Sequence, residues 1–300
     1  MFSVLQAMAK REFQPMLPKL QIVPEDPGRP PEEVPYTPAM RLLLEIAYDG
    51  SEYAGWQIQP HCPSVQGVLQ EEFTRLYSGT PIHLIGASRT DAGVHAMGFA
   101  ASFLSPARPF IPPERIPAII NNKLPPAIRV MSIRETDIAF HTRYDAVGKS
   151  YTYVLNLGAE TPFDARYSWR SRRELDVEAM MAASRILTGT HDFSSFVVER
   201  SMIPDAVRTI YSIDFARYDK YLCITYKGNG FLYKMIRCLT GLLESVGAGR
   251  TSVSDCAAIL EARNRSEAPE TAPARGLFLM KVFFEQDELM KWKLNQLPFA

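Results

Sequence analysis

Hydrophobic and polar residues alternate along the first long apolar segment of the chain, RLLLEIAYD at residues 41–49. A period of two predicts a strand with one buried face. The period lengthens to that of a helix in SVQGVLQEEFTRLYSG at residues 64–79, where apolar residues recur every three or four positions. The same reasoning predicts strands at 81–88, 96–104 and 127–135, and a helix at 112–124 with prolines at its start.

The second half of the chain repeats this order of elements, with one extra short helix. A strand at residues 148–158 precedes a helix at 176–189, for which Asp176 is a suitable N-cap. The pattern then predicts strands at 206–217, 220–228 and 276–285, and helices at 230–247 and 253–263. Each half reads β-α-β-β-α-β, which is typical of a ferredoxin-like fold. We expect an α+β protein in which two tandem ferredoxin-like halves form one extended, mostly antiparallel sheet, with helices on one face and a central cleft.

The distribution of proline sets the expected domain boundaries. Proline recurs so densely between Pro15 and Pro38 that neither a helix nor a strand ladder is expected there. We therefore expect residues 1–39 to form a disordered extension and folded structure to begin near Met40. The predicted organisation is an N-terminal half at 40–145, a C-terminal half at 146–290 and a tail at 291–300.

Composition describes an ordinary globular protein and gives no hint of a charged partner. The chain has 33 Lys and Arg against 33 Asp and Glu, and 46% of its residues are hydrophobic. Binding of a nucleic acid would therefore depend on a local basic patch. One candidate run interleaves arginine with Tyr167 and Trp169, although such a run also suits a solvated strand edge or loop. Its basic members are Arg166, Arg170, Arg172 and Arg173.

Cysteine and histidine give no sign of a metal site. The four cysteines have no CxxC spacing and the five histidines no HExxH pattern, so we expect neither a metal nor a disulfide framework. No apolar run reaches the roughly 18 residues that a membrane span needs. Basic residues near the N-terminus follow a short apolar stretch, which reverses the order of a secretory signal. We expect a cytoplasmic chain that has no contact with a membrane.

The stretch GASRTDAGVHAMG at residues 86–98 places charged residues in a turn-forming segment between two predicted strands. Asp91 lies in this loop, Tyr151 on the first strand of the second half and Arg237 on that half's second helix. The three side chains could therefore meet in the central cleft. Each also has a structural interpretation: Asp91 could accept backbone hydrogen bonds in a turn, Tyr151 could pack within the sheet, and Arg237 could form a structural ion pair.

This loop and five further stretches resemble the signature motifs of the TruA-type tRNA pseudouridine synthases. The motifs follow the family's order and span nearly everything after Met40. The five further stretches are YAGWQIQP at 53–60, FHTRYDAVGKSYTY at 140–153, GTHDFSSF at 189–196, GNGFLYKMIRCLTG at 228–241 and ARGLFL at 274–279. One departure is Ser88, where a glycine is more usual in the family. We expect its small side chain to affect the backbone of the loop without touching the reacting groups.

The resemblance implies a role for each candidate residue. Asp91 would be the catalytic carboxylate, Arg89 would organise the loop and meet the RNA backbone, and Arg237 would pair with Asp91. Tyr151 would stack on or hydrogen-bond the target nucleotide, or take a proton from its ribose. The substrate-binding residues would also include Arg166, Arg170, Arg172, Arg173, Phe231 and Leu277. The family's members work on tRNA as homodimers, with no metal or organic cofactor.

The reaction implied is isomerisation of uridine to pseudouridine in the anticodon stem-loop of tRNA, at tRNA positions 38–40. One carboxylate suffices, either as a nucleophile at C1′ or by stabilising positive charge there while a base removes the C2′ proton to give a glycal. The alternative is a non-catalytic RNA-binding protein or chaperone on the same fold, which would most simply lack one of the three central residues. A carboxylate-dependent nuclease would need clustered acidic residues, and the loop offers Asp91 alone.

Overall fold

The computed structural model describes residues 38–198 and 205–299, and residues 1–37, most of the segment predicted to be a disordered extension, lie outside this range. The strands are β1 (Pro38–Tyr48), β2 (Ile85–Gly86), β3 (His95–Pro106), β4 (Ile128–Thr136), β5 (Gly148–Asn156), β6 (Trp169–Arg170), β7 (Gly189–Asp192), β8 (Val207–Tyr218), β9 (Tyr221–Gly228) and β10 (Leu277–Phe283). The helices are α1 (Val65–Leu76), α2 (Ile116–Asn121), α3 (Val177–Leu187), α4 (Met235–Gly247), α5 (Asp255–Ala262) and α6 (Gln286–Lys291).

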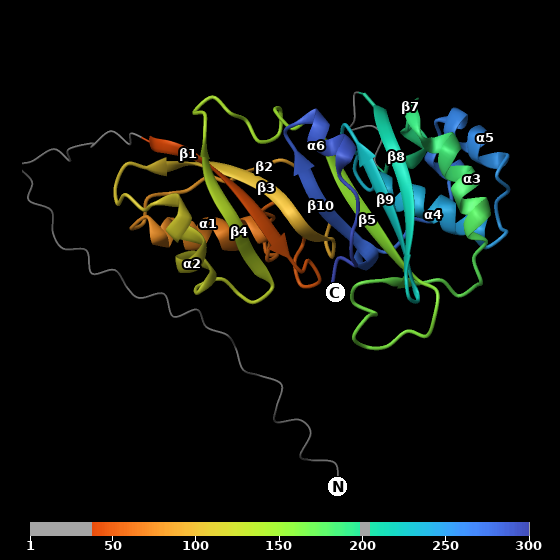
Figure 1. Ribbon diagram of the computed structural model, residues 1–300, viewed down its shortest axis with the longest axis horizontal. Coiled ribbons are helices and arrows are strands. Elements are labelled where there is room, and N and C mark those ends of the chain that lie inside the picture. The colour runs from red at the N-terminus through yellow and green to blue at the C-terminus, as the bar shows by residue number, and fades with distance from the viewer. Residues whose placement is uncertain (1–37, 199–204, 300) are drawn as a thin grey trace, which may run out of the picture. The chain divides into compact units, whose positions relative to one another are not determined.

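The ten strands of the described residues form one sheet, and its two halves share one strand order (Figure 1). The first half reads β4-β1-β3-β2 and the second β10-β5-β9-β8, with β7 beyond β8. Neighbouring strands are antiparallel except for β10 with β3 and β5 with β6. The halves join where β10 pairs with β3, Phe278 opposite His95 and Leu279 opposite Ala96. The predicted fold class, two tandem βαββαβ units in one mostly antiparallel sheet, is confirmed.

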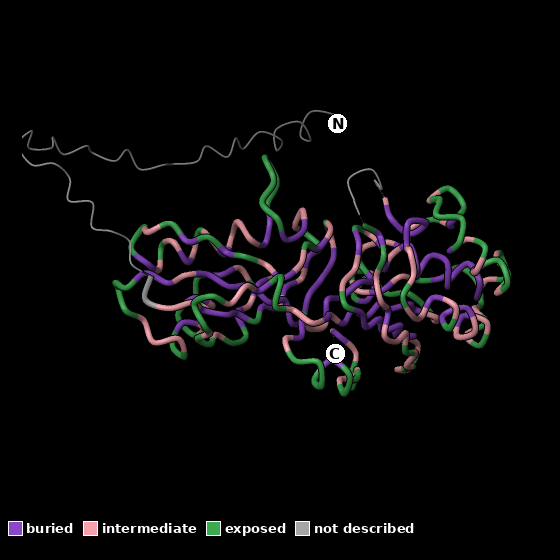
Figure 2. Tube along the Cα trace, turned by 90° about the horizontal axis from the view of Figure 1, so that it is seen from above, coloured by how far each residue is buried: buried purple, intermediate pink, exposed green. Residues whose placement is uncertain are grey.

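Alternation along the central strands assigns one face of the sheet to the main core. On β5, Tyr151, Tyr153 and Leu155 belong to this core, which also takes the buried faces of helices α1 to α5, whereas Val154 faces the other way. Figure 2 shows buried residues mainly in the interior of the molecule and exposed residues mainly at its periphery. A period of two in β5 therefore places Tyr151 on the helix-covered face, where a cleft can form between helices.

The C-terminal segment covers part of the opposite face of the sheet. Leu294, Leu297 and Phe299, in the segment predicted to be a tail, pack against a small cluster centred on Val154 and Phe278. Helix α6, which the hydrophobic pattern did not predict, also packs on this side, since a Cβ on Gly148 would lie 2.4 Å from Leu289. The segment at 294–299 is therefore part of the packed structure.

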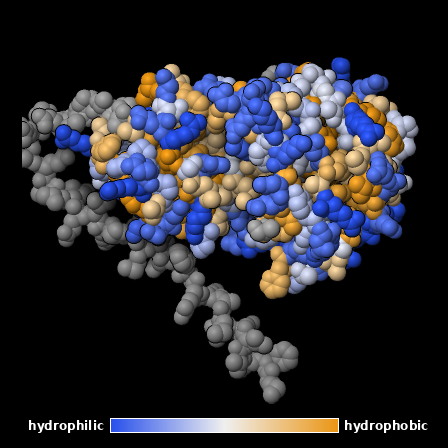
Figure 3. All heavy atoms as spheres, in the orientation of Figure 1, coloured by the Kyte–Doolittle hydropathy of each residue, from blue (hydrophilic) through white to orange (hydrophobic). Residues whose placement is uncertain are grey.

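Elsewhere the face of the sheet opposite the main core is polar. A hollow over β1, β3, β4 and β10 is lined by Glu45, Arg134, Lys281 and Glu288 among others. Hydrophilic residues are frequent over the face seen in Figure 3. A sheet can leave such a face in water because the outward positions of its strands are polar.

Three local features refine the predicted elements. The strand expected at 81–88 is only two residues long, and α4 begins at Met235 because Lys234 has a left-handed backbone with a φ of 59°. The predicted N-cap of α3 is confirmed, since the Asp176 carboxylate accepts a hydrogen bond from the Ala179 amide at 2.9 Å. No helix among the described residues is long and apolar enough to cross a membrane.

Candidate active site

The loop between β2 and β3 carries Asp91, and its turn does not use the Asp91 carboxylate. The Val94 amide donates to the backbone carbonyl of Asp91 at 3.2 Å, and Gly93 supplies the left-handed φ of 77° that the turn needs. The carboxylate instead accepts a hydrogen bond from Arg237, and no backbone amide in the described part of the chain donates to it. The turn-former interpretation of the Asp91 side chain is therefore not what the structure shows.

The loop is held against the rest of the N-terminal half by close backbone packing. A Cβ on Gly55, in the YAGWQIQP stretch, would lie 2.2 Å from the Thr90 carbonyl oxygen, so only glycine fits there. The Tyr48 and Thr90 hydroxyls lie 2.8 Å apart in a buried hydrogen bond. These contacts fix the backbone on the N-terminal side of Asp91 and thereby orient its side chain.

Arg237 reaches Asp91 from the first turn of α4. Its Nη1 donates to Asp91 Oδ2 at 2.8 Å, and its Nε donates to the Ala272 carbonyl at 2.8 Å. The side chains of Arg237 and Asp91 are only 14% and 12% exposed. The planar guanidinium is thus fixed by two acceptors at once, and each charge of the pair is compensated in a site with little water.

Tyr151 lies on the same cleft and contacts the loop that carries Asp91. Its hydroxyl is 3.0 Å from Ser88 Oγ, and its ring meets Phe231 edge-on with centroids 5.4 Å apart. Burial raises the pKa of Tyr151 to about 12, a rise that the Ser88 hydrogen bond reduces and the Asp91 charge increases. The expectation that Ser88 would not touch the reacting groups is wrong, because the loop brings its hydroxyl directly to Tyr151.

The cleft encloses a free volume of about 170 Å³, and most of its charged lining residues are cations. Its lining includes Arg89, Asp91, Tyr151, Phe231 and Leu277, so five predicted site residues meet there. Asp91 is the sole acidic group among the described lining residues. The cationic lining residues are Arg89, Arg143, Lys149 and Lys234. The last three were not predicted, although each lies inside a stretch that carries the family resemblance.

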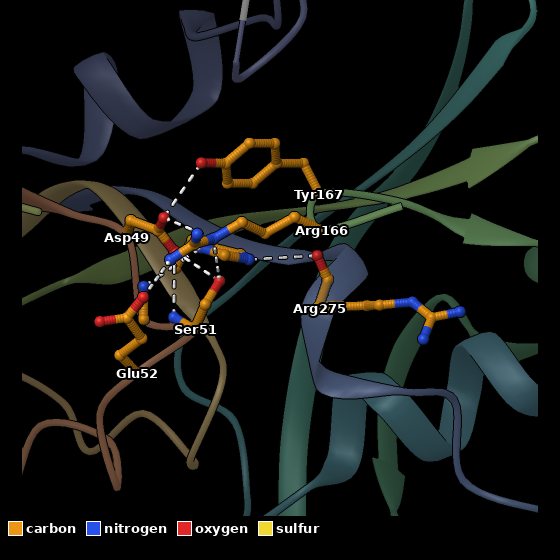
Figure 4. Close-up of polar contacts among 8 residues, drawn as sticks. Asp49, Ser51, Glu52, Arg166, Tyr167 and Arg275 are labelled. Atoms are coloured by element: carbon orange, nitrogen blue, oxygen red, sulfur yellow. Dashed lines mark hydrogen bonds and ion pairs between the residues drawn. The ribbon is translucent and has the colours of Figure 1, made fainter. Parts of the chain in front are cut away.

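Arg166 takes part in a different polar cluster (Figure 4). Its guanidinium pairs with Asp49 at 2.9 Å and with Glu52 at 3.2 Å, and Tyr167 donates to Asp49 at 3.0 Å. Burial opposes ionisation of Asp49, but hydrogen bonds led by that from His95 hold its pKa well below the usual range. The Arg166 charge is thus balanced within the protein. The exposed residues Arg170, Arg172 and Arg173 do not line the Asp91 cleft either.

Within the described residues, no three His, Cys, Asp or Glu side chains converge as a metal site.

A family model described as tRNA pseudouridine synthase matches residues 45–145 and 183–285. The chain belongs to the tRNA pseudouridine synthase family. Members of this family are isomerases, so the chain is a tRNA-modifying enzyme. Asp91 and Arg237 lie in the two matched segments, whereas Tyr151 lies between them.

Three similar members of the family come from bacteria. The tRNA pseudouridine synthase A 1 of Protochlamydia amoebophila is 39% identical over 248 residues, covering 81% of this chain and 96% of the relative. The tRNA pseudouridine synthase A of Latilactobacillus sakei is 38% identical, covering 82% and 99%. That of Halalkalibacterium halodurans is 41% identical over 238 residues, covering 79% and 90%. The similarity to these synthases thus extends through both halves of the sheet.

Proposed function

We propose that the chain isomerises uridine in the anticodon stem-loop of tRNA, at tRNA positions 38–40, with Asp91 as the catalytic carboxylate. The observation that carries the proposal is the Asp91–Arg237 ion pair in a cleft whose other charged lining residues are cations. A polyanionic RNA is attracted to such a cleft. Arg237 balances the negative charge of Asp91, so a carboxylate can be kept at the point where the RNA must approach.

The chemistry asks for little beyond this carboxylate. The N-glycosidic bond breaks, the uracil turns, C5 bonds to C1′, and a proton leaves C5 while N1 gains one, so no group is imported and nothing is oxidised. On one route Asp91 attacks C1′, and on the other it stabilises positive charge there while the C2′ proton is removed. Deuterium at C2′ of the target ribose separates them, because only the second route breaks that bond.

We propose that Tyr151 hydrogen-bonds the target nucleotide as a donor. With its pKa raised to about 12 by burial, the phenol is protonated at neutral pH, which supports donation rather than proton abstraction. Phe231 and Leu277 offer apolar lining to a uracil that has left its stack. Removing a base from a stem costs a few kcal/mol, which contacts of this kind must offset.

The wider RNA contacts remain proposals that rest on the family resemblance. We propose that Arg89 meets the RNA backbone and that Arg170, Arg172 and Arg173 provide further phosphate contacts. Arg166 can join them only after releasing Asp49 and Glu52. We further propose that the halves at 40–145 and 146–290 act together within a homodimer, which sedimentation of the full chain would test.

Position mapping tests the proposed substrate. The purified chain is incubated with tRNA transcripts whose uridines at tRNA positions 38, 39 and 40 are replaced by cytidine one at a time, and pseudouridine is then mapped at single-nucleotide resolution. We expect product only at those positions of the three that hold uridine. Product elsewhere in the tRNA, or none at these positions, would refute the assignment.

A further inference from the structure

Lys149 is a charged residue of the cleft for which the proposed chemistry has no use. It precedes Tyr151 by two residues on β5, so both side chains lie on the same face of the sheet. Both line the cleft that contains Asp91. Within residues 38–198 and 205–299 no carboxylate pairs with the Lys149 ammonium, unlike Lys220 and Lys281, which pair with Asp164 and Glu288. Lys149 is therefore a cation without a partner beside the catalytic group.

The neighbours of Lys149 increase the local positive charge. Burial, then the charges of Arg143 and Arg208, lower the pKa of Lys149 to about 8. Arg143 is exposed and lines the same cleft. Arg208, on β8, has an acidic neighbour only at 3.9 Å, in the carboxylate of Asp205. Three cations are thus held together against their mutual repulsion, which an anion bound among them would relieve.

We propose that Lys149 and Arg143, with Arg208 beside them, bind a backbone phosphate of the RNA strand that carries the target uridine. This inference rests on the proposed function and adds an anion subsite to it. Lys149 and Tyr151 are about 7 Å apart along the strand, so a phosphate on Lys149 and a nucleoside at Tyr151 occupy neighbouring positions of one cleft. Lys149 and Arg143 are therefore positioning residues that set how far the ribose enters toward Asp91.

The test combines a neutral lysine replacement with neutral phosphates. Lys149→Met keeps the length of the side chain and removes its charge, and Lys123→Met, at an exposed lysine that does not line the cleft, is the matched control. The affinity of each protein is measured for a synthetic anticodon stem-loop RNA and for a set of variants of this RNA. Each RNA variant carries a single neutral methylphosphonate linkage, at a different position around the target uridine. Product formation is measured on the unmodified RNA in the same preparations.

We expect the parent and Lys123→Met to lose about tenfold in affinity when one particular linkage is neutral, as for a charge-assisted contact. Lys149→Met should bind the unmodified RNA about tenfold more weakly and be indifferent to that same linkage. Its slope of log affinity against log salt should fall by about one. If Lys149→Met still responds to every linkage as the parent does, the subsite is refuted.

Two further measurements keep the outcomes distinct. Should Lys149→Met melt far below the parent, Arg143→Gln, at an exposed side chain, gives the same linkage test. Product from the parent is scored separately from binding. A parent that makes no pseudouridine on the stem-loop refutes the proposed function, whereas a parent that makes it while Lys149→Met keeps the parental linkage profile refutes the subsite alone.

Discussion

Replacement of Asp91 by asparagine removes one charge while conserving the size of the side chain. Asparagine can still accept the hydrogen bond that Arg237 donates at 2.8 Å, but a charge-assisted bond becomes a neutral one. We expect the free energy of unfolding to fall by about 1–2 kcal/mol, which is the difference between a charge-assisted and a neutral hydrogen bond. Because both side chains keep slight solvent exposure, water can partly hydrate the Arg237 guanidinium, whose charge is then no longer balanced, and the fold should survive.

The catalytic loss should be far larger than the loss of stability. An amide is a very poor nucleophile and cannot balance positive charge at C1′, so we expect the rate to fall at least ~10⁴-fold, about 5 kcal/mol of transition-state stabilisation. Affinity for tRNA should stay within about tenfold, or ~1.4 kcal/mol. Any change should favour tighter binding, since a negative charge leaves a cleft that faces a polyanion.

The assay is release of tritium from tRNA labelled at uracil C5, with filter binding and a melting curve on the same preparation. Asp164→Asn is the matched control, because Asp164 is also a largely buried carboxylate, is paired with Lys220 and does not line the cleft. It should melt a few degrees lower and keep near-parental turnover. Retention of a tenth of the parent rate by Asp91→Asn would refute the catalytic role, and activity falling only in step with melting temperature would make Asp91 structural.

Four further changes probe the site and its surroundings. Tyr151→Phe keeps the ring and should slow turnover at least ~100-fold with tRNA affinity nearly unchanged; equal losses in rate and affinity would mark a binding residue. Ser88→Gly removes one neutral hydrogen bond to the Tyr151 hydroxyl and should slow single turnover about three- to tenfold. An unchanged rate would show that Ser88 does not position Tyr151. Arg237→Lys should lose most of the activity, because an ammonium lacks the planar fork with which Arg237 donates to both Asp91 and Ala272. Near-normal turnover would remove the ion pair from the mechanism. Burial opposes ionisation of Asp164, but hydrogen bonds led by that from Lys220 lower its pKa from 3.8 to about 2. The contribution of Asp164 to stability is therefore present above pH 3.8 and is lost toward pH 2. In a plot of melting temperature against pH, Asp164→Asn should fall less steeply than the parent between pH 3.8 and pH 2, and an equally steep fall would contradict this.

Periodicity and motif order were sufficient to predict where the main elements lie. Asp91, Tyr151 and Arg237 could be brought together on paper because a tandem repeat places the loop, strand and helix that carry them around one cleft. The pairing of Ser88 with Tyr151 could not be predicted, since the direction of one side chain depends on how the loop leaves β2. Arg166 shows the converse limit, because a basic run does not reveal that Asp49 and Glu52, more than a hundred positions earlier, balance its charge.

Lys149 was overlooked for a related reason. Its motif indicates Tyr151 as the functional residue, and a lysine on a strand is ordinarily a solvated residue. Only the placement of β5 near Arg143 and Arg208 shows that this lysine is half-buried among cations and short of an anion. Burial and charge balance are collective properties of a fold, so they become visible only when distant segments are placed together.

Strand β10 has a consequence for the time at which the enzyme becomes active. It is inserted between β3 and β5, and Ala272, the second acceptor of Arg237, lies shortly before it. Asp91 and Arg237 are themselves 146 positions apart. Since chains fold from the N-terminal side during synthesis, the first half can form while the edges of β3 and β5 await their common neighbour. The Asp91–Arg237 pair can be completed only when almost the whole chain has left the ribosome. A product of premature termination before Leu277 should therefore be inactive and prone to association through its open strand edges.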